Sequence, residues 1–240
     1  MSILVVLAGP NGSGKTSLYD EVVYSPYFPD LFISPDDLAD TEPFRSIPDI
    51  VHRYHATMNY GENLRNQALA LRLPFAFETV MSTTAKLDFL RAVRDRGYFT
   101  ELIFVSTSDP KINVERIAQR RISGGHDVPI DKVFSRFNRC LALLPEALAI
   151  VDVAKVYDNS GPHPILGYFK RIDEPPLLLN RETRPAWIET AVVEPLLANR
   201  SLFSRPQDLT IAETVEVAEC IYHDRITFVE GGINGEIIGK

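Results

Sequence analysis

The chain has 240 residues, 45% hydrophobic and 24% charged, which is typical of a globular protein and excludes disorder as the main state. Its net charge of −7 argues against a general nucleic-acid binder, whose affinity depends on neutralising phosphates. Two cysteines, Cys140 and Cys220, are too few for a disulfide framework or a zinc cluster. The early apolar run is too short to span a bilayer and lacks the basic start of a signal peptide. We therefore expect a cytoplasmic protein with no nucleic-acid or membrane partner.

Strands and helices alternate along the first part of the chain, which predicts an α/β fold with a mostly parallel central sheet. The pattern predicts strands at residues 3–8, 31–33, 74–78, 100–106, 155–158 and 165–170. It predicts helices at residues 14–23, 49–73, 83–96, 110–122 and 129–150, with Thr83 as an N-cap.

The first predicted strand and helix flank Gly9 to Thr16, which fits the phosphate-loop pattern G-x-x-x-x-G-K-[ST] in full. Its glycines let successive N–H groups point at phosphate oxygens, and the following helix adds its positive end. Lys15 can bridge the β- and γ-phosphates, and the Thr16 hydroxyl is a natural Mg²⁺ ligand. The predicted nucleotide-binding residues are Gly9, Pro10, Asn11, Gly12, Ser13, Gly14, Lys15, Thr16 and Ser17. The fold expected is thus the three-layer P-loop NTPase type, and a loop that binds nucleotide without catalysis is the alternative.

Acidic residues follow two of the predicted strands at the edge where open α/β sheets bind ligands. Asp36 and Asp37 come after the second strand, and Glu78 closes the third. An acid near an acceptor hydroxyl can orient it and take its proton, whereas Glu78 can bind substrate or hold Mg²⁺ through water. The alternatives are a helix N-cap at Asp36 or Asp37 and an ordinary strand-end acid at Glu78.

A basic helix and a glycine break predict a mobile lid. Arg116 and Arg120 share one face of the 110–122 helix, and Arg136 lies on the next helix. Between the helices stands Gly124-Gly125 followed by His126. Arginines of this kind can neutralise a phosphoryl group, and their alternative is a solvated helix face. His126 either contacts phosphate or supports the loop.

The sequence 173–176, Asp-Glu-Pro-Pro, predicts a boundary between two parts of the chain. The first is a domain at 1–173 that holds the phosphate loop, and the second is an appendage at 174–240. The appendage holds 11 acidic and 6 basic residues, a net charge of −5. We expect helices at 184–199 and 208–222 and a hairpin at 226–238. Its role is not indicated by any motif.

These elements together resemble the zeta toxin family of P-loop kinases, in particular the free-standing bacterial branch with a Gly-Gly-His-x-Val-Pro element. The resemblance covers about residues 1–173. It rests on Gly9–Ser17, Ile33–Asp37, Phe77–Thr79, the stretch from Arg116 through Gly124-Gly125-His126-Asp127-Val128-Pro129 to Arg136, and Tyr157–Ser160. Ser34 and Pro35 depart from the family, which often has Asn where Ser34 stands.

The resemblance implies a magnesium-dependent kinase that uses ATP to phosphorylate a sugar hydroxyl of UDP-N-acetylglucosamine. Lys15 and Thr16 would hold phosphate and Mg²⁺, Asp36 would act as the base, and Glu78 would bind substrate. Arg116, Arg120 and Arg136 would sense phosphate, while Thr79 and His126 would complete the substrate site. An antitoxin-like protein is the partner in the family's toxin systems, and this chain carries no motif that identifies one.

Three functions are thus open. The first is a kinase acting on a nucleotide sugar, and the second is a kinase for another hydroxyl acceptor such as a nucleoside, a polyol or an antibiotic. The third is a nucleotide-binding interaction module whose acidic appendage engages a partner. Asp36 and Glu78 favour an enzyme, because a module that only binds would not require them.

Overall fold

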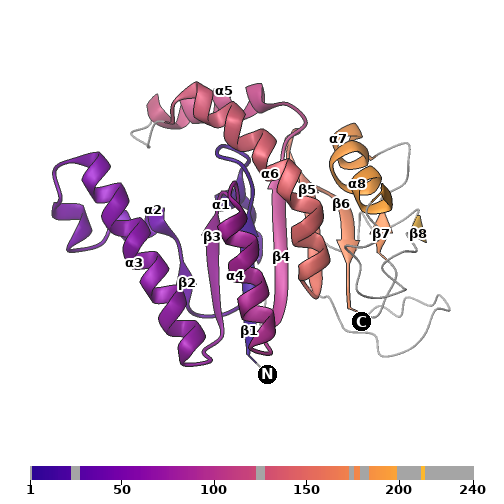
Figure 1. Ribbon diagram of the computed structural model, residues 1–240. Helices are drawn as coiled ribbons and strands as arrows, with labels where there is room; N and C mark the ends of the chain where they lie inside the picture. Colours follow the sequence, from indigo (N-terminus) through magenta and orange to yellow (C-terminus); the bar gives the residue numbers. More distant parts are fainter. Residues whose placement is uncertain are drawn as a thin grey trace, which may run out of the picture.

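The computed structural model describes residues 2–22, 28–122, 128–172, 176–178, 184–198 and 212–213. An eight-stranded sheet in the order β2-β3-β1-β4-β5-β6-β7-β8 forms its centre (Figure 1). The strands are β1 (Ile3–Ala8), β2 (Phe32–Ile33), β3 (Phe75–Thr79), β4 (Phe99–Ser106), β5 (Val153–Asp158), β6 (Ile165–Lys170), β7 (Leu177–Leu178) and β8 (Ala212–Glu213). The helices are α1 (Lys15–Val22), α2 (Pro35–Ala39), η1 (Phe44–Ser46), α3 (Ile50–Ala70), α4 (Thr84–Asp95), α5 (Pro110–Ile122), α6 (Ile130–Ile150), α7 (Ala186–Ile188), η2 (Glu189–Val193) and α8 (Glu194–Ala198).

Strands β2 to β5 are mutually parallel, and β6 reverses direction beside β5, which confirms the mostly parallel sheet. The predicted helix at 208–222 is wrong at Ala212–Glu213, where the backbone pairs with β7. Pairing at a sheet edge can override local helix propensity. The rest of that segment and the predicted hairpin lie outside the described residues.

The apolar run of β1 is buried on both faces of the sheet. Leu4 and Val6 join a large core that also takes side chains from α3, α4 and α6, whereas Val5 and Leu7 join a smaller core with Leu18 of α1. Both sets are at most 3% exposed, as expected for alternate residues of a central parallel strand. Helices therefore pack on both faces of the sheet at β1, with α3, α4 and α6 on one face and α1 on the other, and ligand access is left to the sheet edges.

The start of α2 differs from its sequence interpretation. Ser34 is the N-cap, and its Oγ accepts a hydrogen bond from Asp37 N at 3.3 Å, so neither Asp36 nor Asp37 is the cap. Serine is a strong N-cap, and Pro35 suits the first helical position. At α4, Thr83 occupies the N-cap position as predicted, but its side chain makes no capping hydrogen bond.

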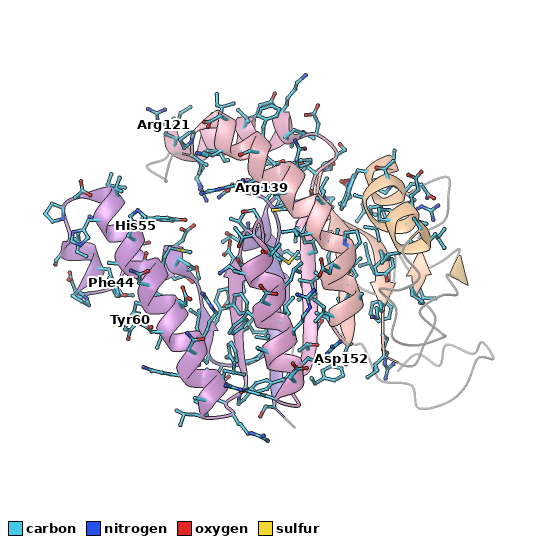
Figure 2. The ribbon with its side chains drawn as sticks, in the orientation of Figure 1. Phe44, His55, Tyr60, Arg121, Arg139 and Asp152 are labelled. Carbon is cyan, nitrogen blue, oxygen red and sulfur yellow. The ribbon has the colours of Figure 1, made fainter. Side chains whose placement is uncertain are left out.

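Two arms rise beside the carboxyl edge of the parallel strands (Figure 1). One is formed by α2, η1 and α3, and carries Phe44, His55 and Tyr60; the other is formed by α5 and the start of α6, and carries Arg121 and Arg139 (Figure 2). The phosphate loop lies between β1 and α1 at this edge.

The described parts of the appendage extend the same sheet and core. Leu178, Trp187, Ile188, Val192 and Leu196 are buried in the large core cluster. The division at residue 173 stays a prediction. No helix in the described ranges is long and apolar enough to span a membrane.

Candidate active site

Three glycines shape the loop between β1 and α1. Gly9, Gly12 and Gly14 have φ values of 149°, 75° and 90°, a region that favours glycine. A Cβ at Gly12 would lie 2.6 Å from the carbonyl oxygen of Asn113, so this position also lacks room for a side chain. The loop is therefore closely packed against neighbouring elements, as a backbone that surrounds phosphate groups needs to be.

Side chains from two other elements fix the loop. Asn113 of α5 is fully buried, and its Nδ2 donates to Asn11 O at 2.7 Å. Asn159, directly after β5, donates from Nδ2 to Ser13 O at 2.8 Å. The sequence pattern does not single out Asn113. The one signal that could indicate its role is a polar amide side chain inside a helix, one turn before Arg116.

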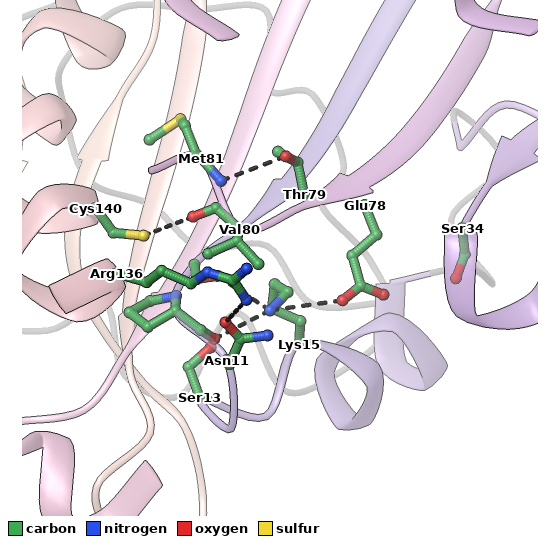
Figure 3. Close-up of polar contacts among 12 residues, drawn as sticks. Asn11, Ser13, Lys15, Ser34, Glu78, Thr79, Val80, Met81, Arg136 and Cys140 are labelled. Atoms are coloured by element: carbon green, nitrogen blue, oxygen red, sulfur yellow. Dashed lines mark hydrogen bonds and ion pairs between the residues drawn. The ribbon is translucent and has the colours of Figure 1, made fainter. Parts of the chain in front are cut away.

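Lys15 joins the phosphate loop to the end of β3 (Figure 3). Its side chain is buried, and Nζ donates to Gly9 O at 3.0 Å and to Pro10 O at 3.1 Å. The same nitrogen lies 3.5 Å from Glu78 Oε1. The predicted phosphate cation and the predicted substrate acid are thus direct neighbours, although Lys15 begins α1 and Glu78 lies in β3.

Two buried polar atoms near the loop have no hydrogen-bond partner within the described residues. They are Ser13 Oγ and Arg116 Nη1. The arginine nitrogen lies 3.8 Å from the position that a Cβ on Gly14 would take. A buried guanidinium nitrogen without a partner is costly, and a phosphate oxygen at the loop would supply the missing partner. The loop and Arg116 therefore fit a bound polyphosphate.

The other predicted arginines take different positions. Arg136 of α6 donates from Nη1 to Asn11 Oδ1 at 3.1 Å, so it reaches the loop (Figure 3). Arg120 is exposed, one turn beyond Arg116 on α5. His126 lies outside the described residues. The structure thus brings Arg116 and Arg136 to the phosphate loop from two helices.

Asp36, the predicted base, follows β2 at this edge of the sheet. It is exposed in the first turn of α2, directly after β2. Ile33 of β2 pairs with Phe77 of β3. Asp36 comes shortly after Ile33 and Glu78 directly after Phe77, so both acids lie at the same end of these neighbouring strands. Thr79, also predicted as a substrate residue, accepts a hydrogen bond at Oγ1 from Met81 N at 3.3 Å.

The described residues contain no group of three or more His, Cys, Asp or Glu side chains that could hold a metal ion. Thr16 and Ser17 are exposed in the first turn of α1, next to Lys15. Mg²⁺ often takes one or two protein ligands and completes its shell with phosphate oxygens and water. The Thr16 hydroxyl fits that role for a magnesium–nucleotide complex.

The segment after β3 is held by Cys140 of α6. Its Sγ donates to Val80 O at 2.6 Å, and burial raises the pKa of this thiol to about 12 despite the nearby cations Lys15, Arg139 and Arg136. A thiol with this pKa stays protonated and unreactive at neutral pH. Cys140 is therefore a structural support for the residues that follow Glu78 and Thr79.

Phosphoryl transfer requires positive charge on the phosphates and an acid close to the acceptor, and basic and acidic side chains lie together at this edge of the sheet. The fold and the site together define the chain as a P-loop kinase. Within that class, the model described as Zeta toxin matches residues 2–165, and the chain belongs to this family. No curated protein matches the chain significantly.

Solved structures agree on the fold. The PezAT toxin–antitoxin system of Streptococcus pneumoniae is matched with a TM-score of 0.51 and 17% identity, covering 68% of this chain and 72% of that one. A native AvrRxo1-ORF1:-ORF2 complex is matched with a TM-score of 0.62 and 10% identity, covering 87% and 73%. The same complex with ATP is matched with a TM-score of 0.55 and 10% identity, covering 70% and 58%.

Proposed function

We propose that this protein transfers the γ-phosphoryl group of ATP to a hydroxyl of a nucleotide sugar such as UDP-N-acetylglucosamine. The observation that carries the proposal is the contact of Lys15 with both the phosphate loop and Glu78. It joins a phosphate site to an acidic acceptor site within a few ångströms. Membership of the Zeta toxin family and the likeness to a fold solved with ATP support the choice of ATP.

In this proposal the acceptor hydroxyl hydrogen-bonds to Asp36, which takes its proton as the new bond forms between oxygen and the γ-phosphorus. The bond from the γ-phosphorus to the β,γ-bridging oxygen breaks, and ADP leaves. Lys15 exchanges the carbonyls of Gly9 and Pro10 for phosphate oxygens. Glu78 accepts hydrogen bonds from the acceptor, with Thr79 beside it.

The arginines complete the site in this proposal. Arg116 and Arg136 neutralise charge on the transferred group from opposite helices, and Arg120 and His126 join when the α5–α6 arm closes. Charge development on the equatorial oxygens makes such contacts stronger in the transition state than in the ground state. Mg²⁺, when bound beside Thr16, would neutralise charge on the β- and γ-phosphates.

The deciding experiment incubates the protein with ATP, Mg²⁺ and UDP-N-acetylglucosamine and detects a phosphorylated sugar nucleotide, with Lys15→Ala as the blank. Asp36→Asn should lower kcat by about 10²-fold or more, as expected for loss of a general base, while ATP still binds. Asp40→Asn is the matched control, because Asp40 is exposed at the other end of α2. A rate near that of the wild type for Asp36→Asn would remove this residue from the role of base.

Other outcomes of the same assay separate the remaining functions. Transfer to a nucleoside, a polyol or an antibiotic, but not to the nucleotide sugar, would keep the kinase and change the acceptor. ATP binding without transfer to any acceptor would contradict the proposal and favour an interaction module.

A further inference from the structure

Arg65 is a buried cation on the acceptor side of the site. It lies on α3, its residue is only 4% exposed, and its Cζ is 5.0 Å from the centre of the Phe77 ring. Among the residues that the structure describes, it makes no hydrogen bond and no ion pair. The face of an aromatic ring attracts a cation, but it does not replace the hydrogen-bond acceptors that a guanidinium has in water.

No carboxylate in the described part of the chain forms an ion pair with this charge. Glu62, one turn earlier on α3, is exposed and raises the pKa of Arg65, but it forms no ion pair with it, and burial lowers that pKa by more. A buried arginine that keeps its charge normally faces a carboxylate or another anion. The missing partner therefore indicates a ligand group.

A second cation acts on the same corner. Lys86, in the first turn of α4, is half-buried, and its pKa is lowered by burial and then by the positive charge of Arg65. Glu62 is the one carboxylate among the described residues that offsets this repulsion. The N-terminal end of α4 adds partial positive charge, and the Thr83 side chain does not cap it. Three positive contributions thus meet at one place.

This corner adjoins the residues assigned to the acceptor. Phe77, whose ring lies against the Arg65 guanidinium, directly precedes Glu78 in β3. It pairs with Ile33 of β2. Gly61, one turn before Arg65, is so close to β2 and α2 that an added Cβ would lie 3.4 Å from Ile33 of β2 and 3.6 Å from Leu38 of α2. Arg65 therefore lies between α2, which carries Asp36, and β3, which carries Glu78.

We propose that Arg65, with Lys86 beside it, binds a phosphate or diphosphate group of the acceptor. This inference rests on the proposed kinase function and names a residue that would recognise its acceptor. A neutral polyol or free sugar, which has no phosphate to meet Arg65, is then a poor substrate. Arg65 is assigned as a substrate-binding residue that is not needed for ATP.

The test compares Arg65→Met with Arg65→Lys, Lys86→Gln and the control Arg94→Met, which removes an exposed charge from α4. We expect Arg65→Met to raise KM for UDP-N-acetylglucosamine by about tenfold or more, the size of a lost charge-assisted hydrogen bond, with KM for ATP unchanged. Arg65→Lys should restore part of this loss, and Lys86→Gln should raise KM less. Unchanged KM for the acceptor, or an equal rise for ATP, would overturn the assignment.

Direct binding separates this inference from the kinase proposal. With AMP-PNP filling the phosphate loop, calorimetry should detect binding of UDP to the wild type and weaker binding to Arg65→Met, even if no phosphoryl transfer occurs to any acceptor. If UDP-N-acetylglucosamine is phosphorylated but UDP binds equally to both proteins, the kinase stands and the inference fails. If the Met variant does not fold, the comparison of Arg65→Lys and Lys86→Gln with the wild type decides in the same way.

Discussion

Lys15, at the start of α1, and Glu78, near the end of β3, lie with 3.5 Å between Nζ and Oε1. The lysine also holds two carbonyls of its own loop. In the proposed function, nucleotide binding exchanges these neutral acceptors for phosphate oxygens while the neighbouring carboxylate remains. The contact thus connects the phosphate loop to the end of β3, where the acceptor is proposed to bind.

Replacing Lys15 with Met should weaken ATP binding by about tenfold or more, since a charge-assisted contact to phosphate is lost. Lys155→Met is the matched control, because Lys155 forms a similar pair with Glu101 at 2.8 Å on β5 and β4. Calorimetric titration with ATP measures both. An equal loss of ATP affinity in the two variants would show that the effect comes from reduced stability and not from a lost contact at the phosphate loop.

Arg116→Met should separate stability from binding. Without nucleotide, the variant should be as stable as the wild type or more stable, because a buried nitrogen without a partner is removed. With ATP, its melting temperature should rise less than that of the wild type. Arg121→Met, an exposed neighbour on α5, is the control. A full ATP-induced shift in Arg116→Met would contradict a phosphate contact.

Gly12 and Gly97 have nearly equal φ, so comparing an alanine at each position separates the steric crowding around the phosphate loop from the cost of the backbone conformation. Gly97→Ala, at φ 77° with open space around it, should lower the free energy of unfolding by about 1 kcal/mol. Gly12→Ala, at φ 75°, also meets the backbone of Asn113 and should lose about 2–5 kcal/mol together with ATP binding. Chemical denaturation of both variants measures this, and similar values would refute the close packing.

Trp187 links the appendage to the loop that holds Ser13. Its Nε1 donates to Asp158 Oδ1 at 3.2 Å, next to Asn159. Trp187→Phe should lower the free energy of unfolding by about 1.5–3 kcal/mol, as for a lost bond to a charged group, and should weaken ATP binding. Thr190→Val, which loses a bond to Trp187 O, is the control for the same helical segment. Unchanged ATP affinity in Trp187→Phe would show that the appendage does not support the site.

Cys140 makes the free energy of unfolding depend on pH in the alkaline range. The unfolded thiol titrates near its ordinary value of 9.0, whereas the folded thiol has a pKa of about 12. Above pH 9 the unfolded chain therefore holds fewer protons, so the free energy of unfolding falls as pH rises toward 12. The contribution of Cys140 is fully present below pH 9, and Cys140→Ala should lack this part of the slope.

Alkylation gives an independent check of the same thiol. In a Cys220→Ser background, iodoacetamide at pH 8 should modify Cys140 only when the chain is unfolded. Fast labelling of the folded protein would contradict the raised pKa.

Much of the fold could be predicted from periodicity and turn residues. The β1–loop–α1 unit and the bounds of α5 follow from local patterns, because the apolar run and the glycines leave few alternatives. The local pattern did not predict the cap at Ser34 or the strand at Ala212–Glu213. The cap depends on which of several good capping residues lies at the start of the helix. The strand depends on pairing with β7, which is distant in the sequence.

The sequence by itself determined the phosphate loop, because its residues are contiguous and its shape depends on local backbone geometry. Only the tertiary structure placed Asn113 and Asn159 on that loop, Glu78 on Lys15, and Arg65 on Phe77 without a counter-ion. These contacts join residues far apart in the chain. Whether a buried charge has a partner depends on what packs around it, and no local pattern records that.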